Sequence, residues 1–596
     1  HELTFRGTLE RAGLNPYLYE HANIREQVSW CSKSDPAGAT RKAVSLVAAA
    51  VAKARLLEEL APIRVDAVKR VAVIGGGVSG LRVARELAGR GIAVTLLERS
   101  PFLGGRMAQM DTLYPTDESA RRLLHGLLEK VTVDPAVEIF TNAHIENISG
   151  CIGNFQVKVR LEPRGITDEF DPGKAYAAMA VCPERAANEF NRFLDTRKAL
   201  YMPYPECYPK LPAIDWKTCT RCGACKVLTG GRGIDLEQRP EEMTLSAGAI
   251  VIATGYDHYQ PAQGEYGFGK SSRIITSPQL MRMLDKEGPT GGRLEIAGRP
   301  VRSVCLIHCV GSRQVEGRDP AGPDGRVNDY CSRVCCTTTL KAARDIKTRF
   351  PSIRVYDLYQ DIRTYGRNHE EYYEKSSELG VTFFRWDGDC PPVVEVPGGD
   401  AAVTVKVKDI LTFGEELEIS ADLVVLATGF VPRDIGDLVE MMKLPRSADG
   451  FLQEVHPKLR PVELAVGGVM VAGTCQAPMD ITESTAAAAA AAVKASGLLV
   501  KGYIEMDPFV AVVNPALCTG GEDCGAVCVT ECSAMQAITI VERVTGGAPA
   551  KIAEINRALC HGCGACVAVC PHEALQVAGW RLDQFDAMVA AIASLP

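Results

Sequence analysis

The 596-residue chain is too long for one hydrophobic core, and at about 100–200 residues per domain it is expected to form several modules. A hydrophobic fraction of 46%, a charged fraction of 23% and a net charge of -7 describe an ordinary globular protein and exclude a basic, nucleic-acid-binding one. The 22 cysteines are too many for a cytoplasmic enzyme without metal, and no secretory signal or small loop-rich domain supports a disulfide framework.

No apolar run is long and bulky enough to span a bilayer. The nearest, 485–500, is mostly alanine and contains Lys494, so it is interpreted as a helix of a globular domain. We therefore expect no membrane span and a cytoplasmic protein. Because the chain begins with His1 rather than methionine, its native start is expected to be missing or processed.

The N-terminal region of the chain predicts helices followed by a βαβ unit. An Ala/Leu-rich helix is predicted over 40–60 and is closed by Pro62. An apolar strand over 70–74, a glycine turn, a helix through Arg90 and a second strand over 93–97 follow.

Later segments repeat the α/β pattern with two interruptions. The block 181–231, rich in Pro, Tyr and Cys, is interpreted as an insertion, and the last 85 or so residues carry dense cysteine and little periodicity. Apolar strands are predicted over 249–255, 301–307 and 423–429.

Three glycines directly after the first strand form a G-x-G-x-x-G motif, Gly75, Gly77 and Gly80. The first makes a tight turn, the second lets a pyrophosphate approach the backbone, and the third lets the helix pack on the sheet. Glu98 ends the next strand, where its carboxylate is placed to accept from ribose hydroxyls. The motif therefore predicts a dinucleotide site.

FAD is favoured over NAD by the spacing of further motifs, which is typical of two-domain flavoprotein reductases; an NAD-only dehydrogenase is the alternative. The expected cofactor-binding residues are Gly75, Gly77, Ser79, Gly80, Glu98, Arg99, Gly105, Arg106, Met107, Ala253, Thr254, Gly255, Gly473 and Thr474. In the second α/β unit the strand ends in Ile307-His308-Cys309-Val310-Gly311-Ser312 without a glycine cradle. We therefore expect this unit to lack NAD(P)H binding.

The C-terminal cysteines form two halves of a bacterial-type ferredoxin with two [4Fe–4S] clusters, in which the fourth cysteine of each run ligates the other cluster. A zinc site would prefer paired C-x-x-C knuckles. One cluster is predicted on Cys518, Cys524, Cys528 and Cys570, and the other on Cys560, Cys563, Cys566 and Cys532.

The insertion carries half of this pattern. Cys219, Cys222 and Cys225 lack a following Cys-Pro, and upstream only Cys182-Pro183 is present. By the crossed rule Cys182 completes a single cluster, and the second cluster of the pair is absent. The third group, Cys309, Cys331, Cys335 and Cys336, does not have ferredoxin spacing, and a redox disulfide or buried thiols explain it equally well.

Taken with these motifs, the chain resembles the A subunits of the heterodisulfide reductases and their bacterial homologues over nearly its whole length. The segments that carry the resemblance are Ala22-Asn23-Ile24-Arg25-Glu26-Gln27-Val28-Ser29-Trp30, Leu103-Gly104-Gly105-Arg106-Met107-Ala108-Gln109, Cys309-Val310-Gly311-Ser312-Arg313 and Tyr330-Cys331-Ser332-Arg333-Val334-Cys335-Cys336.

The resemblance implies an α/β fold with a thioredoxin-reductase-like, two-Rossmann flavoprotein core, an inserted ferredoxin-like domain and a C-terminal two-cluster ferredoxin domain. It also implies an unusual [4Fe–4S] cluster on Cys309, Cys331, Cys335 and Cys336 near the flavin, which brings the expected cofactors to FAD and four [4Fe–4S] clusters. Lys341 matches a family lysine near the flavin ring and is the expected catalytic residue; a solvated helix lysine is the alternative. The six other cysteines, Cys31, Cys151, Cys207, Cys305, Cys390 and Cys475, are expected to be structural.

Two departures from the family bear on function. The insertion has ligands for one cluster where the family has two. Near Thr276 and Ser277, where the family has a glutamate that pairs with the lysine, this chain has Gln279, so Lys341 is expected to lack its carboxylate partner.

The predicted domains are an N-terminal helical segment (1–66), a first FAD-binding segment (67–165), the inserted ferredoxin-like domain (166–236), a second FAD-binding segment (237–290), a second Rossmann-like domain with the unusual cluster (291–418), a third FAD-binding segment (419–503), a C-terminal ferredoxin domain (504–580) and a tail (581–596).

The expected function is that of an electron-transferring, bifurcating or confurcating component of an oxidoreductase complex. The expected partners are heterodisulfide reductase B- and C-like subunits, a hydrogenase- or formate-dehydrogenase-linked subunit, ferredoxin and a second copy of the chain, with no nucleic acid. A non-bifurcating relay, a structural hub and a standalone NAD(P)H reductase are the alternatives.

Overall fold

The computed structural model describes residues 2–595 except 323–324, 399–400, 534–535 and 546–547. The chain divides into two compact units. The larger is Val68–Lys501, and the smaller combines His1–Ala67 with Gly502–Pro596. Among the described residues, no helix has both the length and the apolar character needed to cross a membrane.

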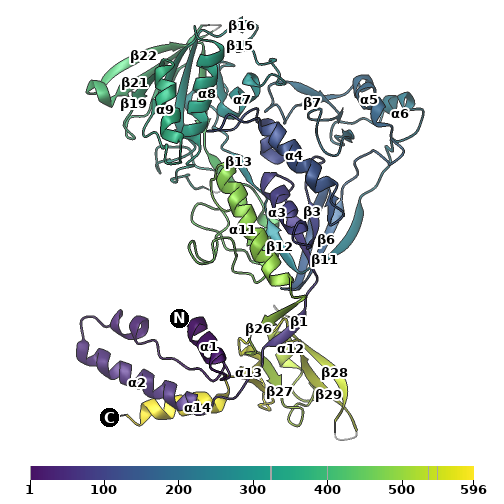
Figure 1. Ribbon diagram of the computed structural model, residues 1–596, viewed down its shortest axis with the longest axis vertical. Coiled ribbons are helices and arrows are strands. Elements are labelled where there is room, and N and C mark those ends of the chain that lie inside the picture. The colour runs from purple at the N-terminus through teal and green to yellow at the C-terminus, as the bar shows by residue number, and fades with distance from the viewer. Residues whose placement is uncertain (1, 323–324, 399–400, 534–535, 546–547, 596) are drawn as a thin grey trace. The chain divides into compact units, whose positions relative to one another are not determined.

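A five-stranded parallel sheet forms the first half of the larger unit. Its strands lie in the order β25–β12–β2–β3–β4, and helices α3 and α11 pack against each other and on it (Figure 1). Val71 and Val73 are fully buried, as expected for a parallel strand covered on both faces. The bounds are β2 Arg70–Ile74, α3 Val78–Ala88, β3 Ala93–Leu97, α4 Ala120–Thr132, β4 Val137–Phe140, β12 Ala249–Ile252, β25 Val469–Val471 and α11 Ile481–Leu499.

The second half repeats the architecture around a parallel sheet in the order β14–β23–β17–β18–β19. A short antiparallel pair, β13 Tyr256–His258 with β24 Phe430–Pro432, joins segments that follow the two sheets. The bounds are β14 Ile274–Thr276, α7 Ser277–Leu284, β17 Ser303–Val310, α8 Cys335–Arg349, β18 Arg354–Tyr359, α9 His369–Glu378, β19 Val381–Arg385 and β23 Leu423–Thr428.

Two three-stranded antiparallel sheets accompany the parallel ones, β5–β6–β11 and β20–β21–β22. Their bounds are β5 Ala143–Cys151, β6 Asn154–Leu161, β11 Glu241–Ala247, β20 Val393–Glu395, β21 Val403–Asp409 and β22 Glu415–Ala421. The predicted α/β fold class with two Rossmann-like halves is confirmed, and β2 and β3 begin and end where the sequence predicts. Strand β17 runs three residues beyond the predicted Ile307 and so includes Cys309.

The insertion lies between β6 and β11 and has its own small core. Ala178, Ala199, Leu200 and two of its cysteines are buried there. Its elements are α5 Ala175–Val181, β7 Arg185–Ala187, β8 Thr196–Lys198, β9 Leu200–Tyr201, β10 Ala213–Ile214 and α6 Ala224–Leu228.

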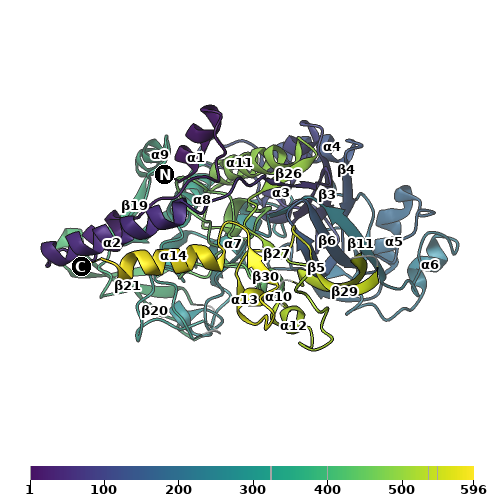
Figure 2. The same cartoon turned by 90° about the horizontal axis from the view of Figure 1, so that it is seen from below.

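The smaller unit brings together both ends of the described chain. Strand β1 (Ile63–Asp66) pairs antiparallel with β26 (Tyr503–Met506). Helix α2 (Pro36–Ala54) lies beside α14 (Leu582–Ala593) in both views (Figures 1 and 2). The segment predicted as a tail therefore contains a packed helix. The other elements of this unit are α1 Glu2–Arg11, β27 Ala511–Val513, α12 Val527–Glu531, β28 Ile538–Thr545, β29 Ala548–Ile555, α13 Ala565–Ala568 and β30 Leu575–Val577.

The predicted bounds of the second N-terminal helix are wrong at both ends. Asp35 caps α2 by accepting a hydrogen bond from the Gly38 amide at 2.9 Å, and Pro36 occupies the first turn, where its missing amide costs nothing. The helix ends at Ala54 in a tightened turn, in which the Leu56 amide donates to the Lys53 carbonyl at 2.9 Å. Beyond it, Gln584 donates to the Leu56 carbonyl at 3.0 Å, and Asn15 donates to the Leu60 carbonyl at 2.8 Å.

Candidate cofactor sites

The glycine turn after β2 has the geometry that each glycine of the motif requires. Gly75 has φ +114°, and a Cβ there would lie 2.3 Å from the Ala253 carbonyl oxygen. A Cβ on Gly80 would lie 1.8 Å from the Gly75 carbonyl oxygen. A Cβ on Gly77 would meet only the Gly105 Cα, at 3.9 Å. The first and third positions are therefore closed by protein, while the second faces open space at the N-terminus of α3.

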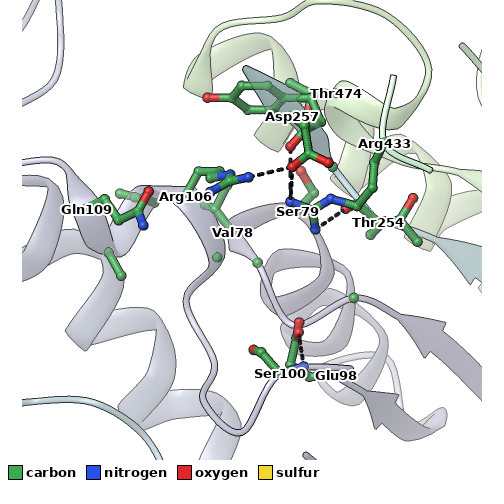
Figure 3. A pocket seen from close by; sticks show the side chains of 18 of the residues that line it. Val78, Ser79, Glu98, Ser100, Arg106, Gln109, Thr254, Asp257, Arg433 and Thr474 are labelled. Atoms are coloured by element: carbon green, nitrogen blue, oxygen red, sulfur yellow. Dashed lines mark hydrogen bonds and ion pairs between the residues drawn. The ribbon is translucent and has the colours of Figure 1, made fainter. Parts of the chain in front are cut away.

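Glu98 is fixed at the end of β3 by two backbone amides. Its carboxylate accepts from Gly76 at 2.6 Å and from Ser100 at 2.8 Å (Figure 3). These bonds leave other lone pairs of the carboxylate available to ribose hydroxyls.

A cavity of about 810 Å³ opens beside this turn. Its size is in the range of ligand and cofactor sites. Thr254 Oγ1 is buried there without a hydrogen-bond partner among the described residues. Most of the predicted cofactor residues line this cavity: Gly75, Gly77, Ser79, Glu98, Arg99, Gly105, Arg106, Met107, Ala253, Thr254, Gly255 and Thr474. The open approach at Gly77, the fixed carboxylate and the unpartnered hydroxyl fit an FAD.

Gly80 and Gly473 do not line the cavity. Gly80 packs under the turn, and Gly473 lies against Ser79, where a Cβ would meet Ser79 Oγ at 2.1 Å. Both glycines let the elements behind the cavity wall pack closely, and neither faces the cavity itself.

Sequence reasoning missed the section of the wall that the insertion supplies. Phe190 and Tyr204 line the cavity and stack on each other, with ring centroids 5.3 Å apart. Arg192 and Tyr201 line it as well. No motif marks these residues; the signal available was the run of aromatic residues in the insertion.

The second Rossmann half supplies the opposite wall through Val334, Thr338 and Lys341. Lys341 is buried, and its Nζ forms an ion pair with Asp345, one turn along α8. Lys341 therefore has a carboxylate partner, but at a different position from the glutamate of the family. Gln279 instead completes the cap of α7, accepting from the Thr276 amide at 2.9 Å, and donates to the Arg192 carbonyl at 3.2 Å.

The four predicted cysteines of the insertion line one small cavity, Cys182, Cys219, Cys222 and Cys225. The Arg221 amide donates to Cys219 Sγ at 3.4 Å, a contact typical of cluster thiolates. Burial and then the neighbouring thiols of Cys219 and Cys182 raise the pKa of Cys225. Thiols that disfavour one another's ionisation fit a site that is neutralised by iron.

In the second Rossmann half Cys335 and Cys336 begin α8 after the N-cap residue Val334, and Cys309 is the second-last residue of β17, with φ +64°. Burial, followed by the charges of Cys336 and Cys331, raises the pKa of Cys309 to about 12. The Arg333 amide donates to Cys331 Sγ at 3.3 Å. The four cysteines of this group are therefore close enough to influence one another's ionisation. Their spacing in the sequence alone did not decide between a cluster, a disulfide and buried thiols.

The electrostatic neighbours of two C-terminal cysteines agree with the predicted crossed sets. Burial, and then the charges of Cys518, Cys524 and Cys570, raise the pKa of Cys528. Burial, and then Cys560, Cys563 and Cys532, raise the pKa of Cys566 to about 11. The Ala553 amide donates to Cys518 Sγ, and the Ala511 amide donates to Cys560 Sγ, each at 3.3 Å.

The cysteine nearest the FAD site among the remaining six has an ordinary structural contact. Cys475 is buried, and its thiol donates to the Ile252 carbonyl at 3.3 Å.

Two segments match family models. Residues 70–109 match the FAD dependent oxidoreductase model, and residues 553–576 match the 4Fe-4S binding domain model. Among solved structures, thioredoxin reductase from T. acidophilum aligns over 72% of this chain and 98% of its own, at 14% identity and a TM-score of 0.39.

Curated relatives cover most of the chain. The iron-sulfur A subunit of the CoB--CoM heterodisulfide reductase of Methanocaldococcus jannaschii is 40% identical over 550 residues, 91% of this chain and 80% of that protein. The A subunit of the H(2):CoB-CoM heterodisulfide,ferredoxin reductase of Methanothermobacter thermautotrophicus is 40% identical over 533 residues, 89% of this chain and 79% of that protein. The chain therefore belongs to the family of heterodisulfide reductase A subunits, which makes it a component of an oxidoreductase.

Proposed function

We propose that the chain binds FAD in the 810 Å³ cavity and four [4Fe–4S] clusters on the sixteen predicted cysteines, and that it transfers electrons between partner proteins in a heterodisulfide-reductase-like complex. Family membership and the matches to FAD and 4Fe-4S models support the two cofactor types. The number of clusters, the ligand sets and the domain boundaries belong to the proposal.

One observation carries this function. In the second Rossmann half, the first turn of α8 contains Cys335 and Cys336, at the position where a nicotinamide domain would hold a pyrophosphate. The adjacent Val334 lines the flavin cavity. The cavity and the cysteine group are therefore neighbours, and a cluster there takes the position that NAD(P)H would need.

The residues around the cavity have separate roles. FAD, when bound, supplies the chemistry that joins two-electron to one-electron transfer. Tyr256 and Phe430, stacked with ring centroids 3.7 Å apart, form an apolar part of the cavity wall. Lys341 places a cation in the wall, and Asp345 balances that charge.

We further propose bifurcation between ferredoxin and a second acceptor. The names of relatives couple H2 or formate and ferredoxin with the CoB–CoM heterodisulfide. By this analogy the partners are B- and C-like subunits, a hydrogenase- or formate-dehydrogenase-linked subunit, ferredoxin and a second copy of the chain. The Lys341–Asp345 pair, which neutralises the cation, favours the second candidate, a relay that does not bifurcate.

Anaerobic turnover of the purified complex separates these functions. If the chain bifurcates, reduction of ferredoxin will require the second acceptor to be present at the same time. A simple relay will reduce ferredoxin without it. In the isolated chain, NADH and NADPH are expected to leave the flavin absorbance unchanged, and rapid bleaching by either would contradict the cluster assignment at α8.

We propose the surface around Cys222 as the ferredoxin contact. Cys222 is exposed, and the segment 216–234 contains four exposed cations and no acidic residue, although the whole chain is acidic. Val227, in the same segment, is 80% exposed. The four cations are Lys217, Arg221, Lys226 and Arg232. Such a rim fits a small acidic electron carrier.

Charge reversal at this rim is expected to slow electron exchange with ferredoxin. The double substitution Lys226→Glu and Arg232→Glu should lower the second-order rate about tenfold at low ionic strength, because it removes electrostatic steering. Stopped-flow reduction measured across salt concentrations checks this. The matched control, Lys375→Glu with Lys408→Glu on exposed positions of the second Rossmann half, should keep the original rate. Equal slowing by both pairs would reject this docking surface.

A further inference from the structure

Three arginine side chains surround one carboxylate in the flavin cavity. Arg106 follows the glycine-rich turn after β3, Arg433 follows β24, and Arg192 comes from the insertion. Arg106 contacts Asp257 Oδ1 at 2.5 Å, and Arg433 contacts the same oxygen at 3.0 Å (Figure 3). The three guanidinium groups therefore interact with the single carboxylate of Asp257.

The arginines retain unused hydrogen-bond donors. Arg433 also donates to the carbonyls of Thr254 and Tyr256, each at 3.0 Å. The Nε atoms of Arg106 and Arg433 are nevertheless buried without a partner in the described region of the chain. The Arg192 side chain forms no hydrogen bond or ion pair with the described residues, and burial together with the charge of Arg106 lowers its pKa to about 9. A partly buried cation without a partner is stabilised by an anion.

Most acidic side chains that line the same cavity are already engaged. Glu98 accepts from two amides, and Glu189 pairs with Arg197. Asp480 accepts from the Glu483 amide at 2.7 Å, and Asp434 accepts from the Gly436 amide at 3.1 Å. Asp257 is the carboxylate that Arg106 and Arg433 both contact, and its charge also acts on Arg192.

The backbone holds Arg192 at the cavity from a fixed support. Arg192 and Phe193 both have positive φ, 56° and 63°, a conformation that side-chain-bearing residues adopt rarely. The Arg192 carbonyl accepts from Gln279, and the adjacent Asn191 Oδ1 accepts from buried Arg282 at 3.0 Å. Both donors belong to α7, so the second Rossmann half supports the loop that carries Arg192.

The location of the three arginines indicates their ligand. Arg106, Arg433, Val78 and Ser79 all line the cavity drawn in Figure 3, and Gly105, which precedes Arg106, lies 3.9 Å from the position of a Cβ on Gly77 at the start of α3. This helix N-terminus and its glycine turn are where a dinucleotide diphosphate binds. A diphosphate offers oxygen acceptors and negative charge to the unpartnered Nε donors of Arg106 and Arg433 and to the guanidinium of Arg192.

We propose that Arg192, with Arg106 and Arg433, binds the diphosphate of FAD, so that the cofactor fastens the inserted ferredoxin-like domain to the flavin domain. The inference rests on FAD binding in this cavity. It assigns the insertion a second role besides holding a cluster, because one of its side chains completes the flavin site. Without FAD, three like charges face one another and the insertion loses this attachment.

The test compares Arg192→Gln with Arg192→Lys and with a control, Arg185→Gln, which alters an exposed arginine of the same insertion. FAD is removed from the full chain under anaerobic conditions and titrated back. R192Q should bind FAD about 10- to 100-fold more weakly than the unchanged chain, as loss of a charge-assisted bond to phosphate predicts. R192K should fall between the two, and R185Q should match the unchanged chain.

Limited proteolysis supplies the second readout. FAD should protect residues 184–232 from cleavage in the unchanged chain and in R185Q, but not in R192Q at the same FAD concentration. Equal iron content in all variants shows that the clusters are intact. Unchanged affinity in R192Q, equal cleavage with and without FAD, or a shifted flavin potential at unchanged affinity would each overturn the proposal. Failure of the unchanged chain to bind FAD would instead reject the proposed function.

Discussion

Replacement of Cys182 by alanine is expected to lower the iron content by about four atoms per chain, the content of one [4Fe–4S] cluster, while the FAD content stays unchanged. Cys182 lies at the end of α5, more than thirty residues before the other three cysteines, yet lines the same small cavity with them. Without the Cys182 thiolate the site keeps three cysteine ligands and lacks the fourth. Iron analysis together with low-temperature EPR of the reduced protein measures the loss.

Cys151→Ala is the matched control, because Cys151 is a partly buried thiol on β5 and no predicted ligand. It should keep the full iron content. A three-iron cluster detected by EPR in Cys182→Ala would still identify Cys182 as the fourth ligand. A complete set of [4Fe–4S] signals in that variant would mean that the crossed ligation rule does not hold for the insertion.

Alanine at Gly77 is expected to impair FAD binding and leave folding intact. Gly77 has φ -79° and ψ -176°, which alanine adopts without strain, and the new methyl group would meet no protein atom closer than 3.9 Å. It would instead enter the space through which the diphosphate approaches the backbone. Overpacking of about 1–3 kcal/mol corresponds to FAD binding about 5- to 160-fold weaker.

Gly80→Ala provides the contrast, because its methyl group would lie 1.8 Å from the Gly75 carbonyl oxygen. That variant should lower the melting temperature even without FAD, whereas Gly77→Ala should melt as the unchanged apoprotein does. Titration of FAD and thermal melting of the apo forms separate the two effects. Tight FAD binding by Gly77→Ala would place the dinucleotide elsewhere.

Local patterns predicted what depends on neighbours in sequence. The βαβ unit, the glycine turn and Glu98 follow from a period and a spacing that lie within thirty residues. The crossed cysteine sets also came from spacing, because the ferredoxin half-repeat fixes which cysteine serves which cluster. The grouping of charges around Cys528 and Cys566 agrees with these sets, which remain predictions until iron is located.

Local sequence patterns could not predict contacts between segments that are distant in the chain. Arg192 meets Arg106 and Arg433 only because three separate segments converge on one cavity, and no motif marks it. The partner of Lys341 was within reach, since Asp345 stands four residues on along the same helix, a spacing at which side chains meet. The resemblance directed attention to Gln279 instead, whose side chain caps a different helix.

The pairing of β1 with β26 delays the folding of the N-terminal segment. Arg64 on β1 bonds Glu505, which is 441 residues later in the chain. At about 5–20 residues per second, the ribosome needs roughly 20–90 s to supply that partner strand. During this interval β1 and the helices before it have no β26 or α14 to pack on, while the segment of the larger unit emerges in full. The nascent N-terminal segment therefore stays without these packing partners until β26 and α14 leave the ribosome.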